Sequence, residues 1–118
     1  MKDLDYVFIG WCKQNPSDKV WGVIKLSDTK RYRAKYLFFW GRRGTKYQTK
    51  IKECYLEEVN RKSLEKIEGG YKSIGLNELN SVYPEFEKDL QTTTFWTMVT
   101  KGSEMGMDSF DKLSGRPE

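Results

Sequence analysis

The stretch FWGRRGTKYQTKIKE (residues 39–53) joins two patterns that decide the fold of the chain. The run KYLFFW (35–40) leads into it, and its continuous apolar character predicts a strand with both faces covered. GRRG (41–44) ends that run with a glycine at each end, which permits backbone dihedrals that other residues avoid. The stretch therefore predicts two strands separated by a glycine-bounded break.

Each of these two strands has two distinct faces. The two-residue period of a strand puts Tyr36, Phe38 and Trp40 on one face, with Leu37 and Phe39 on the other. The second strand, KYQTKIK (46–52), alternates between side chains that suit solvent and side chains that suit a core. The first set is Lys46, Gln48, Lys50 and Lys52, and the second is Tyr47, Thr49 and Ile51. One face of this strand is therefore predicted to be a comb of basic and amide groups.

The flanking sequence supplies more strands and a helix. DYVFIGWC (5–12) and VWGVIKL (20–26) are rich in β-branched and aromatic residues and predict strands, with the turn residues NPSD (15–18) between them. Residues 55–68 predict a helix with one apolar sector, formed by Leu56, Val59, Leu64 and Ile67. Gly69 and Gly70 are expected to end this helix.

The C-terminal third predicts three further segments. EFEKDL, after Tyr83-Pro84, predicts a short helix with proline near its first position. TTTFWTMVT (92–100) is β-branched and predicts a final strand, with the N-terminal strand as its candidate partner. Residues 101–118 predict a flexible tail. The predicted fold class is α+β: one domain over residues 1–100, with an antiparallel sheet and one main helix packed on one face.

Charge is unevenly distributed along the chain. Residues 19–52 hold 11 Lys or Arg and one acid, Asp28, whereas the whole chain has a net charge of only +4. A basic block within a folded segment is expected of a protein that binds the phosphate backbone of nucleic acid. The alternative interpretation is a set of solvated strand faces that bind nothing.

The composition also excludes several kinds of site. The chain has no histidine and only two cysteines, Cys12 and Cys54, so it lacks the residues for a Ser-His-Asp or Cys-His centre and for a four-ligand zinc site. No segment has the length and apolarity of a membrane span, and the N-terminal residues do not resemble a signal peptide. We therefore expect an intracellular protein without metal or cofactor, cytoplasmic in a bacterium or virus and nuclear in a eukaryote.

Residues 18–74 resemble the WGR domain, a module found in DNA-damage-dependent poly(ADP-ribose) polymerases and in some bacterial proteins. The resemblance includes the aromatic strand VWGVIKL, the strand that runs into Trp40-Gly41-Arg42, and the second glycine at Gly44. It continues through the QTK strand (48–50) and a helix that ends in GGYKSI (69–74). The sequence departs from the family pattern at Tyr47, where the family often has glycine.

The resemblance implies nucleic-acid contact rather than catalysis, because the ADP-ribosyltransferase portion of the polymerases has no counterpart here. In those enzymes the tryptophan packs against the sugar-base surface at a DNA break and the arginine contacts the backbone nearby, roles that fall on Trp40 and Arg42. The residue chemistry agrees, since an exposed indole can stack on a base and a guanidinium can grip phosphate oxygens. The alternative for Trp40 is a core tryptophan. Trp11, Trp21 and Trp96 are expected in the core.

These patterns predict a small non-catalytic module that binds nucleic acid, DNA in preference to RNA, at ends or along the backbone. The predicted binding residues are Trp40, Gly41, Arg42, Arg43, Lys46, Gln48, Lys50 and Lys52. The alternative function is a regulatory module that docks on a partner protein. A third interpretation, a small hydrolase, has only scattered carboxylates such as Glu53, Glu57 and Glu58 to support it, and a helix terminus explains these better. No membrane contact is expected.

Overall fold

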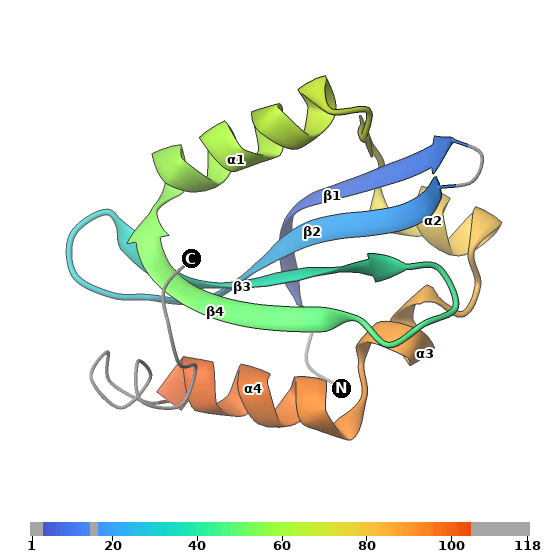
Figure 1. The fold of residues 1–118 in the computed structure, drawn as a ribbon. Helices are drawn as coiled ribbons and strands as arrows, with labels where there is room; N and C mark the ends of the chain where they lie inside the picture. Colours follow the sequence, from blue (N-terminus) through green and yellow to red (C-terminus); the bar gives the residue numbers. More distant parts are fainter. Residues whose placement is uncertain (1–3, 15–16, 105–118) are drawn as a thin grey trace.

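The computed structural model describes residues 4–14 and 17–104, which form a twisted antiparallel sheet between two layers of helices (Figure 1). The strands are β1 (Asp5–Gln14), β2 (Ser17–Asp28), β3 (Arg33–Arg42), β4 (Gln48–Tyr55) and β5 (Lys72–Ser73). Their order across the sheet is β4-β3-β2-β1-β5. The four strands predicted before residue 55 are confirmed, and so is the α+β fold class with its antiparallel sheet.

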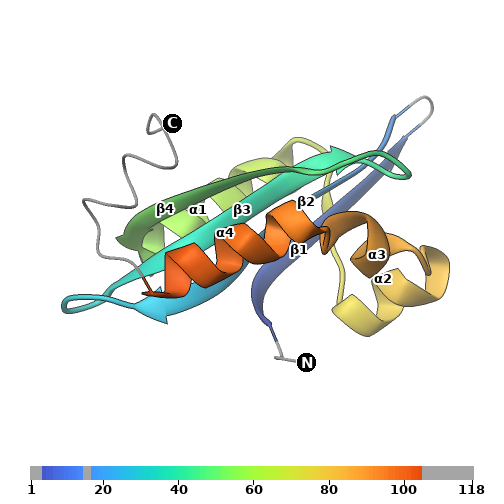
Figure 2. The ribbon, with the colours of Figure 1, turned by 90° about the horizontal axis from the view of Figure 1, so that it is seen from below.

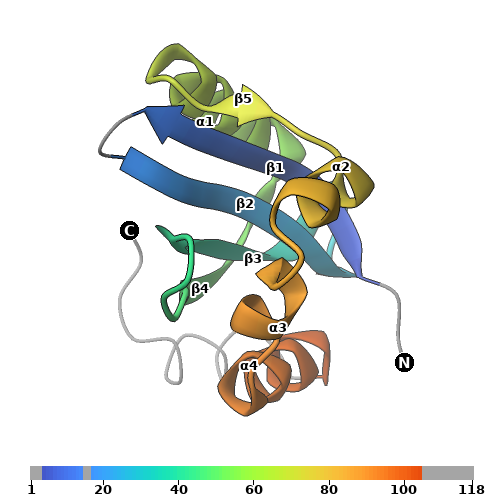
Figure 3. The ribbon, with the colours of Figure 1, turned by 90° about the vertical axis from the view of Figure 1, so that its right-hand side faces the viewer.

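Helices cover both faces of the sheet. The helix α1 (Leu56–Glu68) lies on one face, and α2 (Leu76–Val82), α3 (Phe86–Leu90) and α4 (Thr93–Glu104) lie on the other (Figures 1 and 3). The single covered face expected from the sequence is thus only half of the arrangement. We call the two faces the α1 side and the α4 side.

β3 lies near the centre of the sheet and contributes to both cores, as its continuous apolar run predicts. Leu37 and Phe39 pack into the α4-side core with Ile24, whereas Tyr36 and Phe38 pack on the α1 side with Val59 of α1. These four side chains of β3 are all buried. The two-residue alternation read from the sequence is therefore confirmed on β3.

The prediction of which residues of α1 face the core is wrong. Of the four predicted positions only Val59 is buried; Leu56, Leu64 and Ile67 are 47%, 54% and 43% exposed. Ser63 and the stems of Lys62 and Lys66 take the positions toward the sheet instead, and the lysine ammonium groups lie over aromatic rings of the strands. Long lysine stems can cover apolar surface while the charge stays hydrated, so they replace the leucines in this role.

The segment 92–100, predicted as a strand, is the helix α4, which runs along the α4 side of the sheet (Figure 2). The Oγ1 of Thr92 accepts a hydrogen bond from the N–H of Phe95 over 3.2 Å, as an N-cap residue does. Phe95, Val99 and Gly102 follow one another at helical spacing and are all buried. Packing of this face on the sheet outweighs the β propensity of the threonines.

The remaining C-terminal predictions have mixed outcomes. The short helix after Pro84 is confirmed as α3. α4 continues through residues 101–104, which were predicted to belong to the tail, and residues 105–118 lie outside the described chain. The N-terminal strand β1 pairs with the two-residue strand β5 and not with the segment 92–100.

Candidate nucleic-acid interface

Trp40 lies at the margin of the α1-side core. It stands in one row across the sheet, paired in register with Trp21 of β2 and Gln48 of β4. Trp21 is only 6% exposed and Phe38, the next residue on the same face of β3, is 1% exposed, whereas Trp40 is half-buried. Trp40 therefore packs on the core, as the alternative interpretation expects, and is also partly exposed; stacking on a base stays a prediction.

Three cations border the Trp40 ring. Arg42 lies two residues beyond it on β3 and pairs in register with Lys19 of β2. Lys50 of β4 pairs with Phe38, which places it on the α1 side as well. Diagonal neighbours on one face of a sheet lie about 7–8 Å apart, a distance that long side chains can span, so Lys19 and Lys50 flank the position of Trp40 on its two neighbouring strands. We call the set Lys19, Trp40, Arg42, Gln48 and Lys50 the Trp40 face.

The cations of this face are not neutralised within the fold. Among residues 4–14 and 17–104, no carboxylate forms an ion pair with Lys19, Arg42 or Lys50. Lys19 instead lies over the Tyr71 ring, with its Nζ 5.8 Å from the ring centroid. The face therefore has a concentrated positive charge that solvent or an anionic ligand must balance.

α1 adds two lysines next to this face. Lys62 Nζ lies 5.6 Å from the centroid of Phe38, and Lys66 Nζ lies 5.5 Å from that of Trp21. Lys19, Lys62 and Lys66 were not among the predicted binding residues. Lys19 was recoverable from the strand period, since it precedes Trp21 by two residues on β2. Lys62 and Lys66 could not be identified from the sequence, because the face that α1 buries was predicted incorrectly.

Three of the basic residues predicted to bind do not join the Trp40 face. Arg43 forms an ion pair with Asp18 at 3.3 Å and lies over the Tyr83 ring, so it holds the β3–β4 turn against α2. Lys46 precedes β4 and lines a small cavity beside α4 on the other side of the sheet. Lys52 forms an ion pair with Glu58 of α1.

Gly41 has a packing role. A Cβ atom at this position would lie 3.1 Å from Cδ1 of Tyr47, closer than side chains ordinarily approach. The glycine between Trp40 and Arg42 therefore makes room for Tyr47 inside the protein. At Gly44, by contrast, the φ angle of +84° requires a glycine for conformational reasons.

The basic block of the sequence is partly balanced in space. Besides Arg43 and Lys52, Lys25 pairs with Asp28 at 2.7 Å and Arg33 pairs with Glu53 at 3.4 Å. Most of these carboxylates come from outside residues 19–52, so the segregation along the chain overstates the segregation on the surface. Of the basic residues of this block for which the described chain shows no ion pair, Lys19, Arg42 and Lys50 lie on the Trp40 face, and Lys30, Arg31, Lys35 and Lys46 lie elsewhere.

A tyrosine cluster on the α4 side fixes the β3–β4 turn, which connects two of the strands of the Trp40 face. The hydroxyl of Tyr83 donates to Asp89 and accepts a hydrogen bond from the N–H of Gly44 over 3.0 Å, and the hydroxyl of Tyr47 lies 3.4 Å from it. Burial raises the pKa of both tyrosines, and the hydrogen bonds of Tyr47 to Tyr83 and of Tyr83 to Asp89 act in the same direction. These phenols are therefore neutral donors near pH 7.

We expect the fold to lose stability in alkaline solution because of buried tyrosines. Burial raises the pKa of Tyr6 from its ordinary value of 10.0 to about 12. A pKa raised by folding contributes stability that is fully present below pH 10 and is lost as the pH rises toward about 12. Denaturant titrations at increasing pH, with tyrosinate absorbance recorded in parallel, measure this. Unchanged unfolding free energy above the onset of tyrosinate formation in the unfolded chain would contradict the assignment.

The two cysteines lie inside the protein. Both are buried as free thiols, and burial raises the pKa of Cys54 to about 11. At neutral pH the Cys54 thiol is protonated and acts as a small apolar side chain.

In the part of the chain that is described, no three Cys, Asp or Glu side chains lie together in a way that could hold a metal ion. None of its helices is long and apolar enough to cross a membrane.

The remaining tryptophans agree with their predicted places to different degrees. Trp21 is buried and contacts Phe8 and Phe38 at centroid distances of 5.8 and 5.9 Å. Trp11 and Trp96 are only half-buried and pack against the edge of the α4-side core.

Comparison of the chain with models of protein families, with curated proteins and with solved structures finds no match.

Proposed function

We propose that this protein is a non-catalytic module that binds nucleic acid, with DNA ends or backbone as the ligand, through the Trp40 face. The observation that carries the proposal is a partly accessible indole ringed by three cations that have no carboxylate partner within the described chain. The likeness of residues 18–74 to the WGR domain, and an intracellular location, are parts of the same proposal.

Each residue of the face has a chemical role in the proposal. Arg42 grips phosphate oxygens with two parallel N–H groups, and Lys50 and Lys19 attract neighbouring phosphates as point charges. Trp40 stacks its indole on a terminal base or sugar, an interaction of about 1–3 kcal/mol per base. Gln48 both donates and accepts hydrogen bonds beside the ring. Lys62 and Lys66 extend the positive surface over α1.

The number of cations sets the expected salt dependence. Three phosphate contacts predict a slope of log affinity against log salt of about −3 on duplex DNA, and five contacts, with Lys62 and Lys66 included, predict about −4.5. Binding measured by fluorescence anisotropy over a range of salt concentrations tests this. Affinity that does not change with salt would refute the electrostatic basis of the proposal.

The form of the ligand is tested with a panel. Blunt duplex, nicked duplex, 5′-phosphorylated duplex and single-stranded DNA are compared with the corresponding RNAs at two salt concentrations. Stacking of Trp40 on a terminal base predicts tighter binding to nicked and blunt-ended duplexes than to a closed circular duplex of equal length. Equal affinity for open and closed duplexes would leave backbone binding and remove end recognition from the proposal.

A second function, docking on a partner protein, is favoured by the outer flank of α1. Leu56, Leu64 and Ile67 lie at i, i+8 and i+11 and form an exposed apolar stripe. Glu57, Glu65 and Glu68 border this stripe, so its partner would be an amphipathic segment with basic flanks. The paired substitution Leu64→Glu with Ile67→Glu separates the functions: it should abolish docking of such a peptide and leave DNA affinity within about twofold, because the stripe lies outside the Trp40 face.

A further inference from the structure

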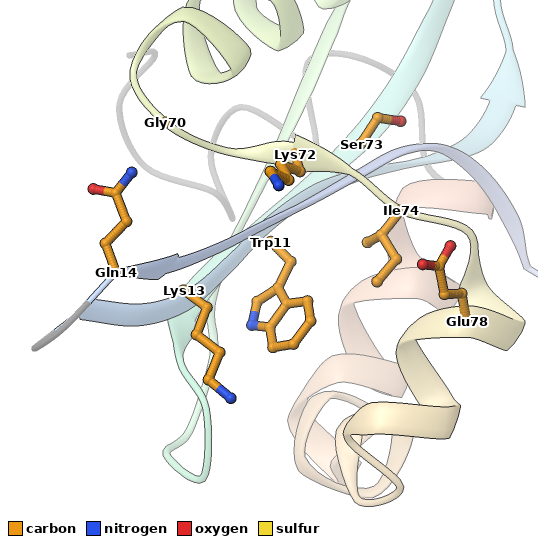
Figure 4. A pocket seen from close by; sticks show the side chains of 8 residues that line it. All are labelled: Trp11, Lys13, Gln14, Gly70, Lys72, Ser73, Ile74 and Glu78. Carbon is orange, nitrogen blue, oxygen red and sulfur yellow. The ribbon is translucent and has the colours of Figure 1, made fainter.

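A cavity of about 280 Å³ lies at the edge of the sheet, lined by residues of β1, β5 and α2 (Figure 4). Trp11 forms part of its wall and pairs in register with Val20, a member of the α4-side core. The Trp11 ring therefore points to the opposite side of the sheet from Trp40. The cavity is separate from the Trp40 face.

The wall of this cavity includes an aromatic ring in a fixed orientation. Trp11 is half-buried, and its indole N–H donates a hydrogen bond to Oδ1 of Asp18 over 2.9 Å. In Figure 4 the indole lies between Lys13 on one side and Ile74 and Glu78 on the other. A ring held in this way offers a flat apolar surface on which a planar ligand can stack.

Charged groups for which the described chain shows no ion pair surround the ring. Lys13, Lys72 and Glu78 are exposed, and within residues 4–14 and 17–104 none of the three forms an ion pair. Lys13 Nζ lies over the Trp11 ring, 5.7 Å from its centroid, so a cation already stands at the aromatic surface. Lys72 reaches the cavity from β5 and Glu78 from α2. Two ammonium groups, which donate hydrogen bonds, and one carboxylate, which accepts them, therefore lie around one aromatic ring.

This combination specifies the chemistry of a ligand. The ligand must present a planar ring to Trp11, a negative charge to Lys13 and Lys72, and a hydrogen-bond donor to Glu78, because a carboxylate only accepts. Nucleobases with an exocyclic amino group supply the ring and the donor. A phosphate supplies the charge, and lysine binds phosphate well as a point charge.

We propose that this cavity binds one nucleoside phosphate unit. The base stacks on Trp11, Glu78 accepts a hydrogen bond from its amino group, and Lys13 and Lys72 hold the phosphate. The unit is either a free mononucleotide or an unpaired nucleotide of a strand, since both present the same chemistry. The proposal does not depend on the Trp40 face, because the two sites have no residue in common.

Calorimetric titration of the full chain with AMP, UMP, adenosine and inorganic phosphate tests the proposal. AMP should bind saturably, and adenosine and phosphate should each bind at least about tenfold more weakly, because each lacks one half of the contacts. Lys13→Ala and Lys72→Ala should each weaken AMP binding about tenfold. The matched control Lys101→Ala removes an exposed cation of α4 and should leave AMP binding unchanged. Glu78→Ala should reduce the preference for AMP over UMP.

Two results would overturn the proposal: no saturable binding of AMP, or AMP binding that neither Lys13→Ala nor Lys72→Ala weakens. These lysines lie on the surface, so their substitution should not unfold the protein. Thermal unfolding of each variant verifies that it is folded. Competition of AMP by a single-stranded oligonucleotide without terminal phosphate identifies a strand as the source of the ligand; absence of competition identifies the free nucleotide. The variant Arg42→Glu should retain AMP binding whatever becomes of its DNA binding, which separates the two proposals.

Discussion

The substitution Phe39→Ala is expected to destabilise the protein by about 3–5 kcal/mol, as large-to-small changes in a closed core do. Phe39 is fully buried at the centre of the α4-side core. Its ring contacts Tyr6, Tyr47 and Phe86 at centroid distances of 6.3, 6.1 and 5.9 Å. Removing the ring therefore leaves a cavity bounded by large side chains from β1, the β3–β4 turn and α3. Chemical denaturation measures the loss, and Tyr32→Ala, at a residue that is 89% exposed, serves as the control with little expected change.

Gly22 makes this prediction sharper. A Cβ atom at Gly22 would lie 2.2 Å from Cζ of Phe39, so the ring occupies the place of the missing side chain. Gly22→Ala alone should cost about 1–3 kcal/mol through overpacking. In the Phe39→Ala background the added methyl group has room, so the double variant should be more stable than the sum of the single losses. Strictly additive losses would mean that the Phe39 ring does not pack on Gly22.

The strands could be predicted from the sequence because their signals are local. The run from Tyr36 to Trp40 is apolar on both faces, and burial of both faces follows directly from that pattern. The spacing of Trp40 and Arg42 likewise predicts one shared face, and the register with Trp21 and Lys19 agrees with it.

The helix faces could not be predicted, because they depend on what each helix meets. Thr92–Thr100 has the composition of a strand, and only the spacing of Phe95, Val99 and Gly102 suits a helix packed on Leu26 and Ile51 of the sheet. For α1, a sequence pattern identifies leucine and isoleucine as the buried side, whereas the aromatic strand face accepts lysine stems in their place.

Some of the predicted basic binding residues form ion pairs inside the protein and others do not. Arg43 and Lys52 seemed equivalent to Arg42 and Lys50 in the sequence, but Asp18 and Glu58 reach them from β2 and α1. Such pairing brings together residues that are far apart or on different elements, so charge counted along the chain cannot reveal it. Lys46 was misplaced because β4 begins only at Gln48.

Charge reversal on the Trp40 face is expected to have the largest effect on function. The double variant Arg42→Glu with Lys50→Glu removes two phosphate contacts and adds repulsion, and should weaken DNA binding about 100-fold or more. Both residues lie outside the buried core, so the free energy of unfolding should change by less than about 1 kcal/mol. These charges test the face better than Trp40→Ala would, since Trp40 also packs on the core and its loss would affect stability as well.

The central claim is therefore tested most directly by measuring the affinity of two charge-matched double variants for one nicked duplex in one buffer. The first is Arg42→Glu with Lys50→Glu; the second is Lys88→Glu with Lys101→Glu, which changes net charge equally at exposed positions of α3 and α4 on the opposite side of the sheet. Binding by the Trp40 face predicts about a 100-fold loss in the first variant and less than about a threefold loss in the second. Equal losses in the two variants would show that only net charge matters, and would contradict a binding site at Trp40.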